Sequence, residues 1–422
     1  WILYERCKGH RAEQWHCDSV VVCCEGSHLG TRAYRTVTLH ILADENIPAV
    51  EHFFPADAHV QRLGGRAIGR AQLQNIDILL VRSVTRVDAS LLSGTAVKFI
   101  GTATSGLDHI DQAYLSQRGI GFAYAPGSNA NSVVEYVLAA VASISDTLEK
   151  LLAGGIVGIV GYGHIGKAVA ARFEALGIRY RVFDPWLQQS MINQAATLEQ
   201  ILNCDVVTLH PELTTDAPWP SHHLLGSAEL ERLRPDSVLI NASRGPVIDN
   251  AALLAQLTSE PKFSTVVDVW EGEPDISAAL LERVTVGSAH VAGYSLDGKL
   301  LATRMLSDAL KTWQHNALPA TDSPVAAASA LLLPAGLSRA GQIRYLLQSR
   351  YDISMDDALL RQSMATEQVV TTPAERFDQL RKSYRERREL AGSVVALAVP
   401  TAAQGDTLRA LGCIASSSTD AE

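Results

Sequence analysis

The sequence has no long hydrophobic run and no excess of positive charge. Of its 422 residues, 47% are hydrophobic and 19% charged, yet no apolar stretch approaches the roughly 18 residues that a membrane-spanning helix needs. The formal net charge of -9 disfavours nonspecific binding to nucleic acid or anionic lipid. The composition is typical of a soluble globular protein, and the length predicts two or three domains because one hydrophobic core rarely serves so long a chain.

Cysteine is scarce beyond the N-terminal segment, since only Cys204 and Cys413 follow Cys24. A chain that needs no disulfide and lacks the features of a secretory signal is expected in a reducing compartment, the cytoplasm. Residues 1–36 show no periodicity, and we expect them to be a disordered or artefactual extension. Their cysteines and histidines lack the paired spacing of a zinc site, so we expect no metal.

From Val37 onward, short apolar runs alternate with helix-like stretches. The predicted strands form two series, residues 38–43, 76–81, 97–101 and 119–124, then 156–160, 180–183, 206–210, 237–241 and 265–269. A long apolar helix is expected between the two series, over residues 132–152. This alternation predicts an α/β protein with two open, mainly parallel sheets.

The C-terminal part differs in amino-acid composition from the rest of the chain. Residues 320–336 are rich in Ala, Ser, Pro and Leu and predict a linker before a further compact unit. Within that unit, residues 373–389 combine apolar residues at helical spacing with many arginines and glutamates. The pattern predicts an amphipathic surface helix whose arginines face solvent or another subunit.

The strongest motif is G-x-G-x-x-G at Gly161, Gly163 and Gly166, with His164 and Ile165 inside the turn. An apolar strand precedes it and a helix candidate follows it, a context that favours dinucleotide binding over a purely structural turn. The glycines would let the backbone approach a pyrophosphate at the helix N-terminus. Asp184, at the end of the next strand, would bind the ribose hydroxyls and repel the extra phosphate of NADP, which favours NAD.

Three later runs end or follow predicted strands and carry Arg244, Glu273 and His290. Ligands bind beyond the carboxyl ends of parallel strands, so we expect these side chains to converge. Oxidation of a 2-hydroxy acid needs a base for the hydroxyl proton and a cation for the carboxylate. Histidine, a carboxylate partner for its protonated form, and arginine supply these functions.

The runs N-A-S-R-G-P-V-I-D, D-V-W-E-G-E-P and H-V-A-G-Y resemble signatures of the D-2-hydroxyacid dehydrogenase family, and the resemblance covers roughly residues 38–410. It implies carboxylate binding by Arg244, acid/base catalysis by His290, and pairing of Glu273 with His290. It also implies an NAD site to which further residues contribute beside the glycine turn, Asp184 and Arg244: Pro211, Ala242, Ser243, Asp268 and Gly293.

Several local runs narrow the resemblance to the erythronate-4-phosphate branch of that family: A-D-E-N-I-P, V-R-S-V-T, G-T-A-T-S-G-L-D-H-I-D and R-K-x-Y-x-E-R-R-E. This branch implies NAD-dependent oxidation of 4-phospho-D-erythronate to 3-hydroxy-2-oxo-4-phosphooxybutanoate in pyridoxal 5'-phosphate (vitamin B6) biosynthesis. Ser83, Thr104 and Tyr294 would contact the substrate. Arg82, Arg86 or Lys299 could neutralise its phosphate, although a surface or ion-paired role is the commoner one for any single cation.

The resemblance also implies a domain plan. Residues 37–131 and 294–319 would form a flavodoxin-like substrate-binding domain, and residues 132–293 would form an NAD-binding Rossmann domain. Residues 337–422, after the linker, would form a small α+β domain that mediates homodimerisation. The sequence departs from the family at Pro211, which stands one residue ahead of the usual position and has no amide hydrogen to offer a cofactor. Weaker NAD binding is one expected consequence.

Two alternatives share these motifs. One is another member of the family, such as phosphoglycerate dehydrogenase or a glyoxylate/hydroxypyruvate reductase, against which the C-terminal unit argues. The other is a non-catalytic NAD-sensing protein built on the same fold, because fold alone never establishes function. Turnover of a hydroxy acid would distinguish an enzyme from a sensor.

Overall fold

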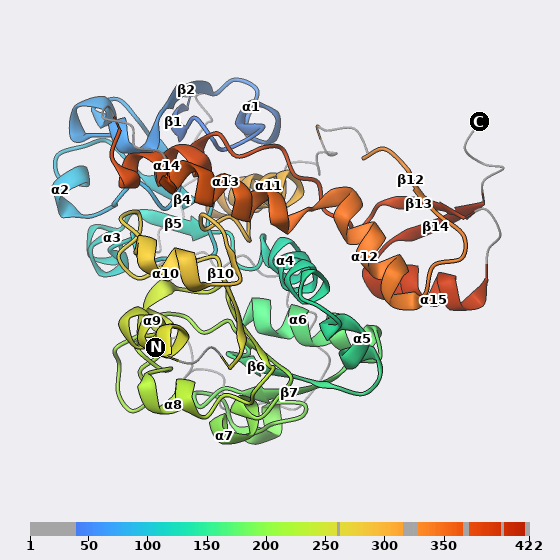
Figure 1. Ribbon diagram of the computed structural model, residues 1–422. Helices are drawn as coiled ribbons and strands as arrows, with labels where there is room; N and C mark the ends of the chain where they lie inside the picture. The colour runs from blue at the N-terminus through green and yellow to red at the C-terminus, as the bar shows by residue number, and fades with distance from the viewer. Residues whose placement is uncertain are drawn as a thin grey trace.

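The computed structural model describes residues 39–259, 262–314, 324, 328–365, 371–397 and 401–417, so the N-terminal extension lies outside the described residues. Figure 1 shows the first sheet above the second, and a C-terminal segment that ends in a third, small sheet. Within the described ranges, no helix is both long enough and apolar enough to cross a membrane.

The first sheet is parallel, with the strand order β2-β1-β3-β4-β5. This is the flavodoxin-like order. Its strands are β1 (His40–Asp44), β2 (His59–Leu63), β3 (Ile78–Val81), β4 (Phe99–Thr102) and β5 (Gly121–Tyr124). The four predicted strands are confirmed, but β2 was missed because this edge strand buries none of its residues and has no apolar run.

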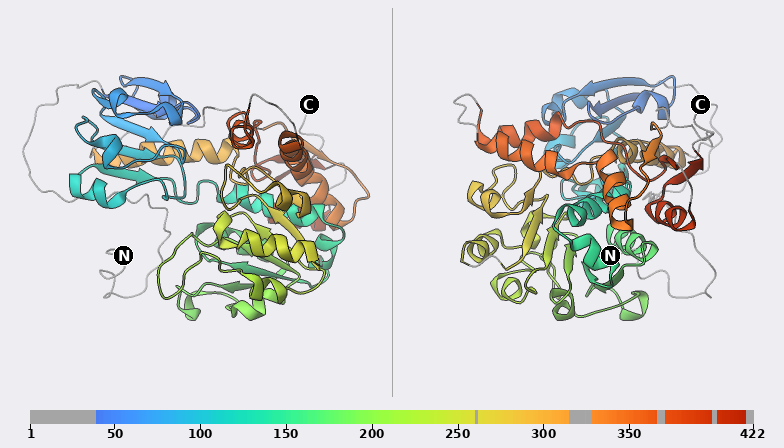
Figure 2. Two further views of the ribbon diagram at one scale, coloured as in Figure 1. Left: turned by 60° about the vertical axis from the view of Figure 1, so that its left-hand side comes forward. Right: turned by 45° about the vertical axis from the view of Figure 1, so that its right-hand side comes forward.

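Four helices belong to this sheet: α1 (Val50–Phe53), α2 (Ala89–Leu92), α3 (Gln112–Arg118) and α11 (Leu296–Trp313). The last of them comes from far along the chain, and Figure 2 shows it lying along the sheet. Leu306 and Leu310 of α11 pack in the same buried cluster as Ile41 and Phe99. The chain therefore returns to the first sheet after completing the second.

The second sheet is also parallel, with the order β11-β10-β9-β8-β6-β7. Its strands are β6 (Ile156–Val160), β7 (Arg179–Phe183), β8 (Val206–Leu209), β9 (Val238–Asn241), β10 (Ser264–Val267) and β11 (Val286–Gly287). Its helices are α6 (His164–Ala175), α7 (Leu198–Leu202), α8 (Ser227–Glu231), α9 (Asn250–Ser259) and α10 (Ala278–Arg283). All predicted strands are confirmed, and only the two-residue β11 was missed. Strand order reverses between β6 and β8, the place where such sheets bind ligands.

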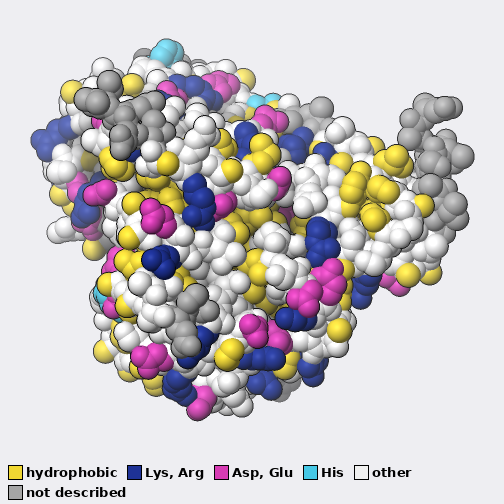
Figure 3. Space-filling view, viewed as in Figure 1, with side chains coloured by type: hydrophobic (Ala, Val, Ile, Leu, Met, Phe, Trp, Pro, Cys, Tyr) yellow, Lys and Arg dark blue, Asp and Glu magenta, His cyan; other side chains and the backbone are white. Residues whose placement is uncertain are grey.

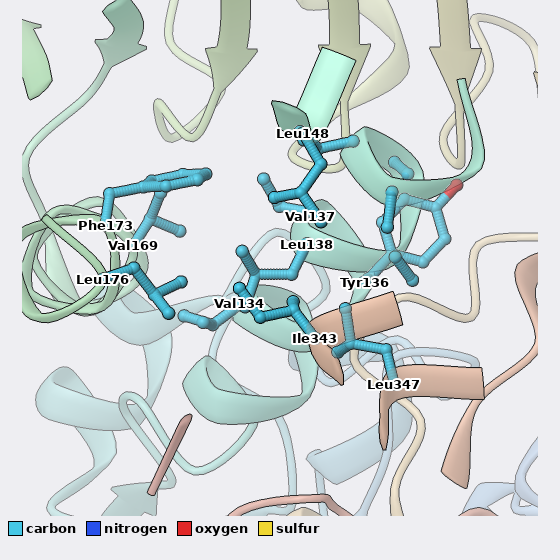
Figure 4. Packing of buried hydrophobic residues seen from close by; sticks show 14 of the residues in the cluster. Val134, Tyr136, Val137, Leu138, Leu148, Val169, Phe173, Leu176, Ile343 and Leu347 are labelled. Atoms are coloured by element: carbon cyan, nitrogen blue, oxygen red, sulfur yellow. The ribbon is translucent and has the colours of Figure 1, made fainter. Parts of the chain in front are cut away.

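Helix α4 (Ala130–Ser143) connects the parts of the molecule. It is apolar nearly all round and buried from Ser132 to Ala142, as expected of a helix surrounded by protein. Figure 4 shows its side chains Val134 and Leu138 between Phe173 of α6 and Ile343 of the C-terminal helix α12 (Arg339–Arg350). The single long helix predicted over residues 132–152 is wrong, because α4 ends at Ser143 and α5 (Thr147–Leu152) follows a turn.

The C-terminal segment forms a parallel sheet of β12 (Leu331–Leu333), β13 (Val394–Leu397) and β14 (Ile414–Ser417). Its helices are α12 (Arg339–Arg350), α13 (Ile353–Ala365), α14 (Pro373–Lys382) and α15 (Ala402–Leu411). The predicted α/β class with two Rossmann-like sheets and a small C-terminal unit is confirmed. The linker prediction is wrong for β12, whose backbone pairs with β13.

The prediction of an amphipathic surface helix over residues 373–389 is confirmed for residues 373–382, which form α14 with Phe377 buried, and is wrong for residues 383–389. Helix α14 ends at Lys382, and the arginines that follow point inward. Arg387 is 2% exposed, donates to the carbonyl of Ser132 on α4 at 2.9 Å, and lies over the Tyr351 ring. Arg388 pairs with Asp297 of α11 at 2.9 Å. A run rich in arginine and glutamate can therefore form an internal network when its charged side chains meet partners.

Glu135 of α4 is a titratable part of this network. Its Oε1 accepts hydrogen bonds from the backbone amides of Leu390 and Ala391, at 2.7 and 3.0 Å. Burial raises its pKa to about 7, so the folded protein binds a proton that the unfolded chain releases above its ordinary value of 4.5. The stabilisation by this proton is complete below pH 4.5 and is lost as the pH rises to 7.

We therefore predict that Glu135→Gln flattens the pH dependence of the free energy of unfolding. Glutamine keeps the acceptor for both amides but cannot ionise, so the variant avoids a loss on the order of 3 kcal/mol between pH 4.5 and 7. Urea denaturation at several pH values measures the difference, with the surface variant Glu231→Gln as the control. Parallel curves for Glu135→Gln and the unmodified protein would contradict the assignment.

Candidate active site

The glycine turn follows β6 and faces the loop after β8. Gly161 has a φ of +86°, and a Cβ there would lie 2.6 Å from the nitrogen of Pro211. A Cβ on Gly166 would lie 1.9 Å from the carbonyl oxygen of Gly161. A Cβ on Gly163, in contrast, would meet no atom within 4 Å. Packing of the protein thus requires two of the glycines, and the third borders open space where a ligand can approach the backbone.

Helix α6 starts at His164 directly behind this turn. No side chain caps its N-terminus, so the amides of its first turn are left for another acceptor. Asp184, at the end of β7, lies beside the turn and accepts a hydrogen bond from the amide of Tyr162 at 2.8 Å. The uncapped amides of α6, the open space at Gly163 and the carboxylate of Asp184 lie together at one turn. This arrangement fits the binding of a dinucleotide.

His210 and Pro211 follow β8 on the other side of the turn. His210 is buried, its Nε2 lies 2.9 Å from Oγ1 of Thr208, and burial lowers its pKa to about 3. Its Nδ1 has no hydrogen-bond partner within the described part of the chain. The backbone of Pro211 is packed against Gly161, so the proline shapes the floor of the glycine turn. Its effect on NAD affinity stays a prediction.

The loop carrying Arg244 is shaped by Asn241, the last residue of β9. The side-chain oxygen of Asn241 accepts from the amide and hydroxyl of Ser243, at 3.2 and 3.0 Å, and its amide donates to the carbonyl of Arg244. Ala242 and Ser243 are buried beneath this loop. We did not single out Asn241 from the sequence, although a polar residue that ends an apolar strand is a usable signal.

The Arg244 guanidinium joins the two sheets. Its Nε and Nη2 donate to Oδ2 of Asp108, at 3.2 and 2.9 Å, in the loop after β4. The group also lies against Gly106, where a Cβ would be 2.0 Å from Nη2. Asp108 was not among the predicted site residues. Its carboxylate occupies the planar fork that Arg244 would offer to a substrate carboxylate.

The same loop after β4 places Thr104 near Arg244. Oγ1 of Thr104 donates to the carbonyl of Gly106 and lies 2.8 Å from Oγ1 of Thr102. Thr102 in turn contacts His109, whose pKa burial lowers to about 4, so this histidine is neutral at physiological pH. Ser83 is exposed in the loop after β3.

His290 and Glu273 form a direct pair. Nδ1 of His290 and Oε1 of Glu273 share a short hydrogen bond, and Oε2 of Glu273 accepts from the amide of Trp270 at 3.1 Å. Burial alone would raise the pKa of Glu273, but attraction to His290 and these hydrogen bonds hold the pKa below its ordinary value. An ionised carboxylate at Nδ1 fixes the ring orientation and leaves Nε2 for other chemistry.

Asp268 positions the loop that carries His290. Its buried carboxylate accepts from the hydroxyl of Ser288 at 2.6 Å and from the amides of Val291 and Ala292, at 2.8 and 3.0 Å. Burial raises the pKa of Asp268. Gly293 ends the loop against Asn129, where a Cβ would be 2.6 Å from Nδ2.

The Arg244 and Glu273 loops are held together. Gly245 packs on the backbone of Trp270, where a Cβ would lie 2.1 Å from the carbonyl carbon. The backbones and side chains of Asn250 and Glu271 exchange two hydrogen bonds of 3.2 Å. The structure therefore brings the three loops bearing Arg244, Glu273 and His290 together beyond the carboxyl ends of β9, β10 and β11.

Tyr294 follows His290 and contacts several cations. Its phenolic oxygen accepts from Arg82 at 2.9 Å and from Arg381 at 3.2 Å, and Nζ of Lys299 lies 4.8 Å from the ring centre. Arg86, in contrast, pairs with Asp88 and its side chain is 80% exposed. Sequence reasoning missed Arg381 because the run around it was interpreted as a surface helix.

One group of side chains has the composition of a metal site. Ligand atoms of His222, His223 and Glu271 lie within 4.8 Å of one another at the surface. Nε2 of His223 is already hydrogen-bonded to Glu271 at 2.8 Å, and the two imidazole rings stack. We assign no metal to this group.

Comparison with known proteins gives two family matches. The family described as "D-isomer specific 2-hydroxyacid dehydrogenase, NAD binding domain" matches residues 135–292, and "Domain of unknown function (DUF3410)" matches residues 324–412. An erythronate-4-phosphate dehydrogenase of Salmonella arizonae is 43% identical over 83% of this chain and 92% of its own length. That of Cellvibrio japonicus is 42% identical over 89% and 99%.

The chain belongs to the erythronate-4-phosphate dehydrogenase family. The predicted resemblance is thus confirmed, and the cofactor of this family member is NAD, as predicted.

Solved structures support the fold of this dehydrogenase family member. D-Lactate dehydrogenase from Aquifex aeolicus, complexed with NAD and lactic acid, has a TM-score of 0.54 at 22% identity, covering 65% of this chain and 95% of that one. Cofactor-bound 3-phosphoglycerate dehydrogenase from Entamoeba histolytica has a TM-score of 0.57 at 19% identity, covering 66% and 96%. These likenesses concern the fold alone.

For this dehydrogenase, we predict that Gly161→Ala raises the Kd for NAD at least tenfold. The added Cβ would collide with the backbone at Pro211 and displace one wall of the glycine turn. Gly177→Ala is the matched control, because Gly177 also has a positive φ, +69°, but a Cβ there meets nothing within 4 Å. Both variants carry the backbone strain of about 1–3 kcal/mol, and only the first carries the collision.

Titration of each protein with NAD, followed by fluorescence, measures the two affinities, and thermal unfolding checks that the variants are folded. A folded Gly161→Ala protein that binds NAD as tightly as the control would refute the assigned geometry of the turn.

Proposed function

We propose that this protein oxidises 4-phospho-D-erythronate to 3-hydroxy-2-oxo-4-phosphooxybutanoate with NAD, a step in pyridoxal 5'-phosphate biosynthesis. The observation that carries the proposal is the His290–Glu273 pair beside the Arg244 loop, on a chain similar to named erythronate-4-phosphate dehydrogenases over nearly their whole length. The oxidation needs a base, a carboxylate that stabilises the base once it is protonated, and a cation for the substrate carboxylate. His290, Glu273 and Arg244 supply these three functions.

We propose that Arg244 binds the substrate carboxylate. Its guanidinium now donates twice to Asp108, which is 51% exposed and stands where an anionic ligand would bind. A substrate carboxylate can replace that of Asp108 and present one oxygen to each nitrogen, whereas Asp108 accepts both bonds at Oδ2 alone. The substrate would thus exchange one ion pair for another, so Arg244 is never left without an acceptor.

We propose that His290 accepts the proton of the C2 hydroxyl at Nε2, because Nδ1 is engaged by Glu273. NAD, when bound, supplies the acceptor for the hydride from C2. As the proton and hydride leave, the C2–O bond becomes a carbonyl. Glu273 stabilises the imidazolium that forms and holds the ring in place, and in the reducing direction His290 returns the proton.

The remaining predicted substrate and cofactor contacts are proposed from the positions of these residues in the structure. Ser83, Thr104 and Tyr294 would bind substrate, since Thr104 lies in the loop of Asp108 and Tyr294 follows the His290 loop. The cofactor would contact the glycine turn with His164 and Ile165, Asp184 and the strand-end loops: Pro211, Ala242, Ser243, Arg244, Asp268 and Gly293. Residues 37–131 with 294–319 would bind substrate, and residues 132–293 would bind NAD.

We propose that two copies associate through the C-terminal unit, residues 337–422, and that the enzyme acts in the cytoplasm, where Cys204 and Cys413 remain thiols. The small sheet buries one face against the core through Leu333 and Val395. On its other face Leu332 is 60% and Ile414 57% exposed. Figure 3 shows hydrophobic side chains gathered on this part of the surface.

We predict that the purified protein reduces NAD with 4-phospho-D-erythronate, that it is inactive with 3-phosphoglycerate, and that His290→Ala lowers kcat by at least 100-fold, the usual contribution of general acid/base catalysis. A 2-oxo acid is included so that tightly held NADH is reoxidised. Absorbance at the nicotinamide band follows turnover. Activity with 3-phosphoglycerate alone would keep the family chemistry and overturn the substrate.

For association, we predict that Leu332→Glu with Ile414→Glu converts a dimer into monomers in sedimentation velocity. The control is Leu301→Glu, which makes the same kind of substitution, with one added charge, at a leucine 46% exposed on α11. Buried apolar area is the main driving force of such contacts, so two charges should disrupt it. A dimer unchanged by the double substitution, or a monomer before any substitution, contradicts the proposed interface.

A further inference from the structure

Three cations meet at one phenol beside the active site. Arg82 comes from the loop after β3, Lys299 from α11, and Arg381 from α14 of the C-terminal segment. The two guanidinium groups donate to the phenolic oxygen of Tyr294, at 2.9 and 3.2 Å, and the ammonium of Lys299 lies over its ring. Parts of the chain that are hundreds of residues apart thus direct positive charge to a single place.

In the described part of the chain, no carboxylate lies within ion-pair distance of these three cations. In the described ranges none of the three cations forms an ion pair, unlike Arg385, Arg388 and Arg361 of the same C-terminal segment, which all do. Nε of Arg381 is buried and has no hydrogen-bond partner there. Like charges repel when desolvated, and burial together with Arg82 lowers the pKa of Lys299 to about 8. Such a concentration of charge is costly unless an anion binds to it.

The phenol itself is poised to donate. Its oxygen accepts from both arginines, and the described residues show no acceptor for its own hydrogen. An anionic oxygen at this place would accept that hydrogen and the free guanidinium hydrogens together. Oxygens of a phosphate provide enough acceptors for several such donors at once.

The position of the cluster relative to the reacting centre suits a substrate with two charged ends. Tyr294 stands four residues after His290, and its amide donates to the carbonyl of Val291 in the same loop at 2.8 Å. Arg381 is also attracted by Glu273, the partner of His290. Arg244, which has its own carboxylate partner, lies on a different loop. One cationic site for a carboxylate and a second for a dianion are therefore present.

We infer that Arg381, Arg82, Lys299 and Tyr294 form the phosphate subsite, and that the C-terminal unit of unknown function contributes Arg381 as a specificity-determining residue. The inference rests on the proposed function and extends it to a part of the chain that the catalytic fold does not include. Helix α14 is held beside the first sheet by the ion pair of Arg66 with Asp378, at 2.5 Å.

The test compares the discrimination between 4-phospho-D-erythronate and D-erythronate, which lacks the phosphate. Arg381→Gln should lower kcat/KM for the phosphorylated substrate by about 10- to 100-fold, the usual effect of removing a hydrogen bond to a charged group, mainly through KM. It should leave kcat/KM for D-erythronate within about threefold, since the carboxylate and hydroxyl contacts remain. Arg381→Lys keeps the positive charge but lacks the planar guanidinium. Its kcat/KM for the phosphorylated substrate should therefore lie between those of Arg381→Gln and the unmodified protein.

Lys382→Gln is the matched control, because it removes the same charge from the next residue, whose side chain is 62% exposed and does not contact Tyr294. Thermal unfolding shows whether each variant is folded. Equal losses on both substrates in a folded Arg381→Gln protein would overturn the subsite, as would an equal loss in Lys382→Gln.

A direct binding experiment separates this inference from the proposed function. Calorimetry with the NAD-loaded protein and inorganic phosphate should show binding that Arg381→Gln weakens at least tenfold and Lys382→Gln does not. If the protein turns over no 4-phosphoerythronate yet binds phosphate in this Arg381-dependent way, the proposed substrate fails and the subsite stands. Turnover without Arg381-dependent phosphate binding or discrimination overturns the subsite alone.

Discussion

The geometry of the candidate active site depends on the buried carboxylate of Asp268. It fastens the loop of His290 through two backbone amides and the hydroxyl of Ser288, which is also 2.8 Å from the phenol of Tyr136 on α4. Removing an acceptor of this kind leaves several buried donors unpaired, which costs more than the bonds themselves contribute. Through Tyr136 the position of His290 is coupled to α4, on which the second sheet and the C-terminal segment pack.

The C-terminal segment is consequently part of the active enzyme rather than an appendage. Its buried Arg387 donates to the carbonyl of Ser132 on α4 and to that of Ala292, two residues after His290, and α14 brings Arg381 to Tyr294. A family relative without this segment would lack both contributions. This dependence gives a physical reason for a phosphate-specific member of the fold to carry an additional unit, since the two open sheets alone supply Arg82 and Lys299 at Tyr294 but not the guanidinium of Arg381.

The sequence predicted those features that local patterns encode. The glycine turn, the strands and the Arg244, Glu273 and His290 loops follow from periodicity, turn chemistry and family signatures, and the structure brings the three loops together. The partners that depend on tertiary structure were missed: Asp108 and Arg381 reach their neighbours Arg244 and Tyr294 across 136 and 87 residues of sequence. Residues 383–389 were misjudged because charge density alone does not distinguish a solvated helix from an internal ion-pair network.

The most direct test of the whole account is a crystal structure of the protein with NADH and 4-phospho-D-erythronate. The account predicts the carboxylate on Arg244 in place of Asp108, the C2 hydroxyl within hydrogen-bond distance of Nε2 of His290, and the phosphate among Arg82, Lys299, Arg381 and Tyr294. A substrate bound in the opposite sense, or a phosphate that contacts none of these four side chains, would contradict it.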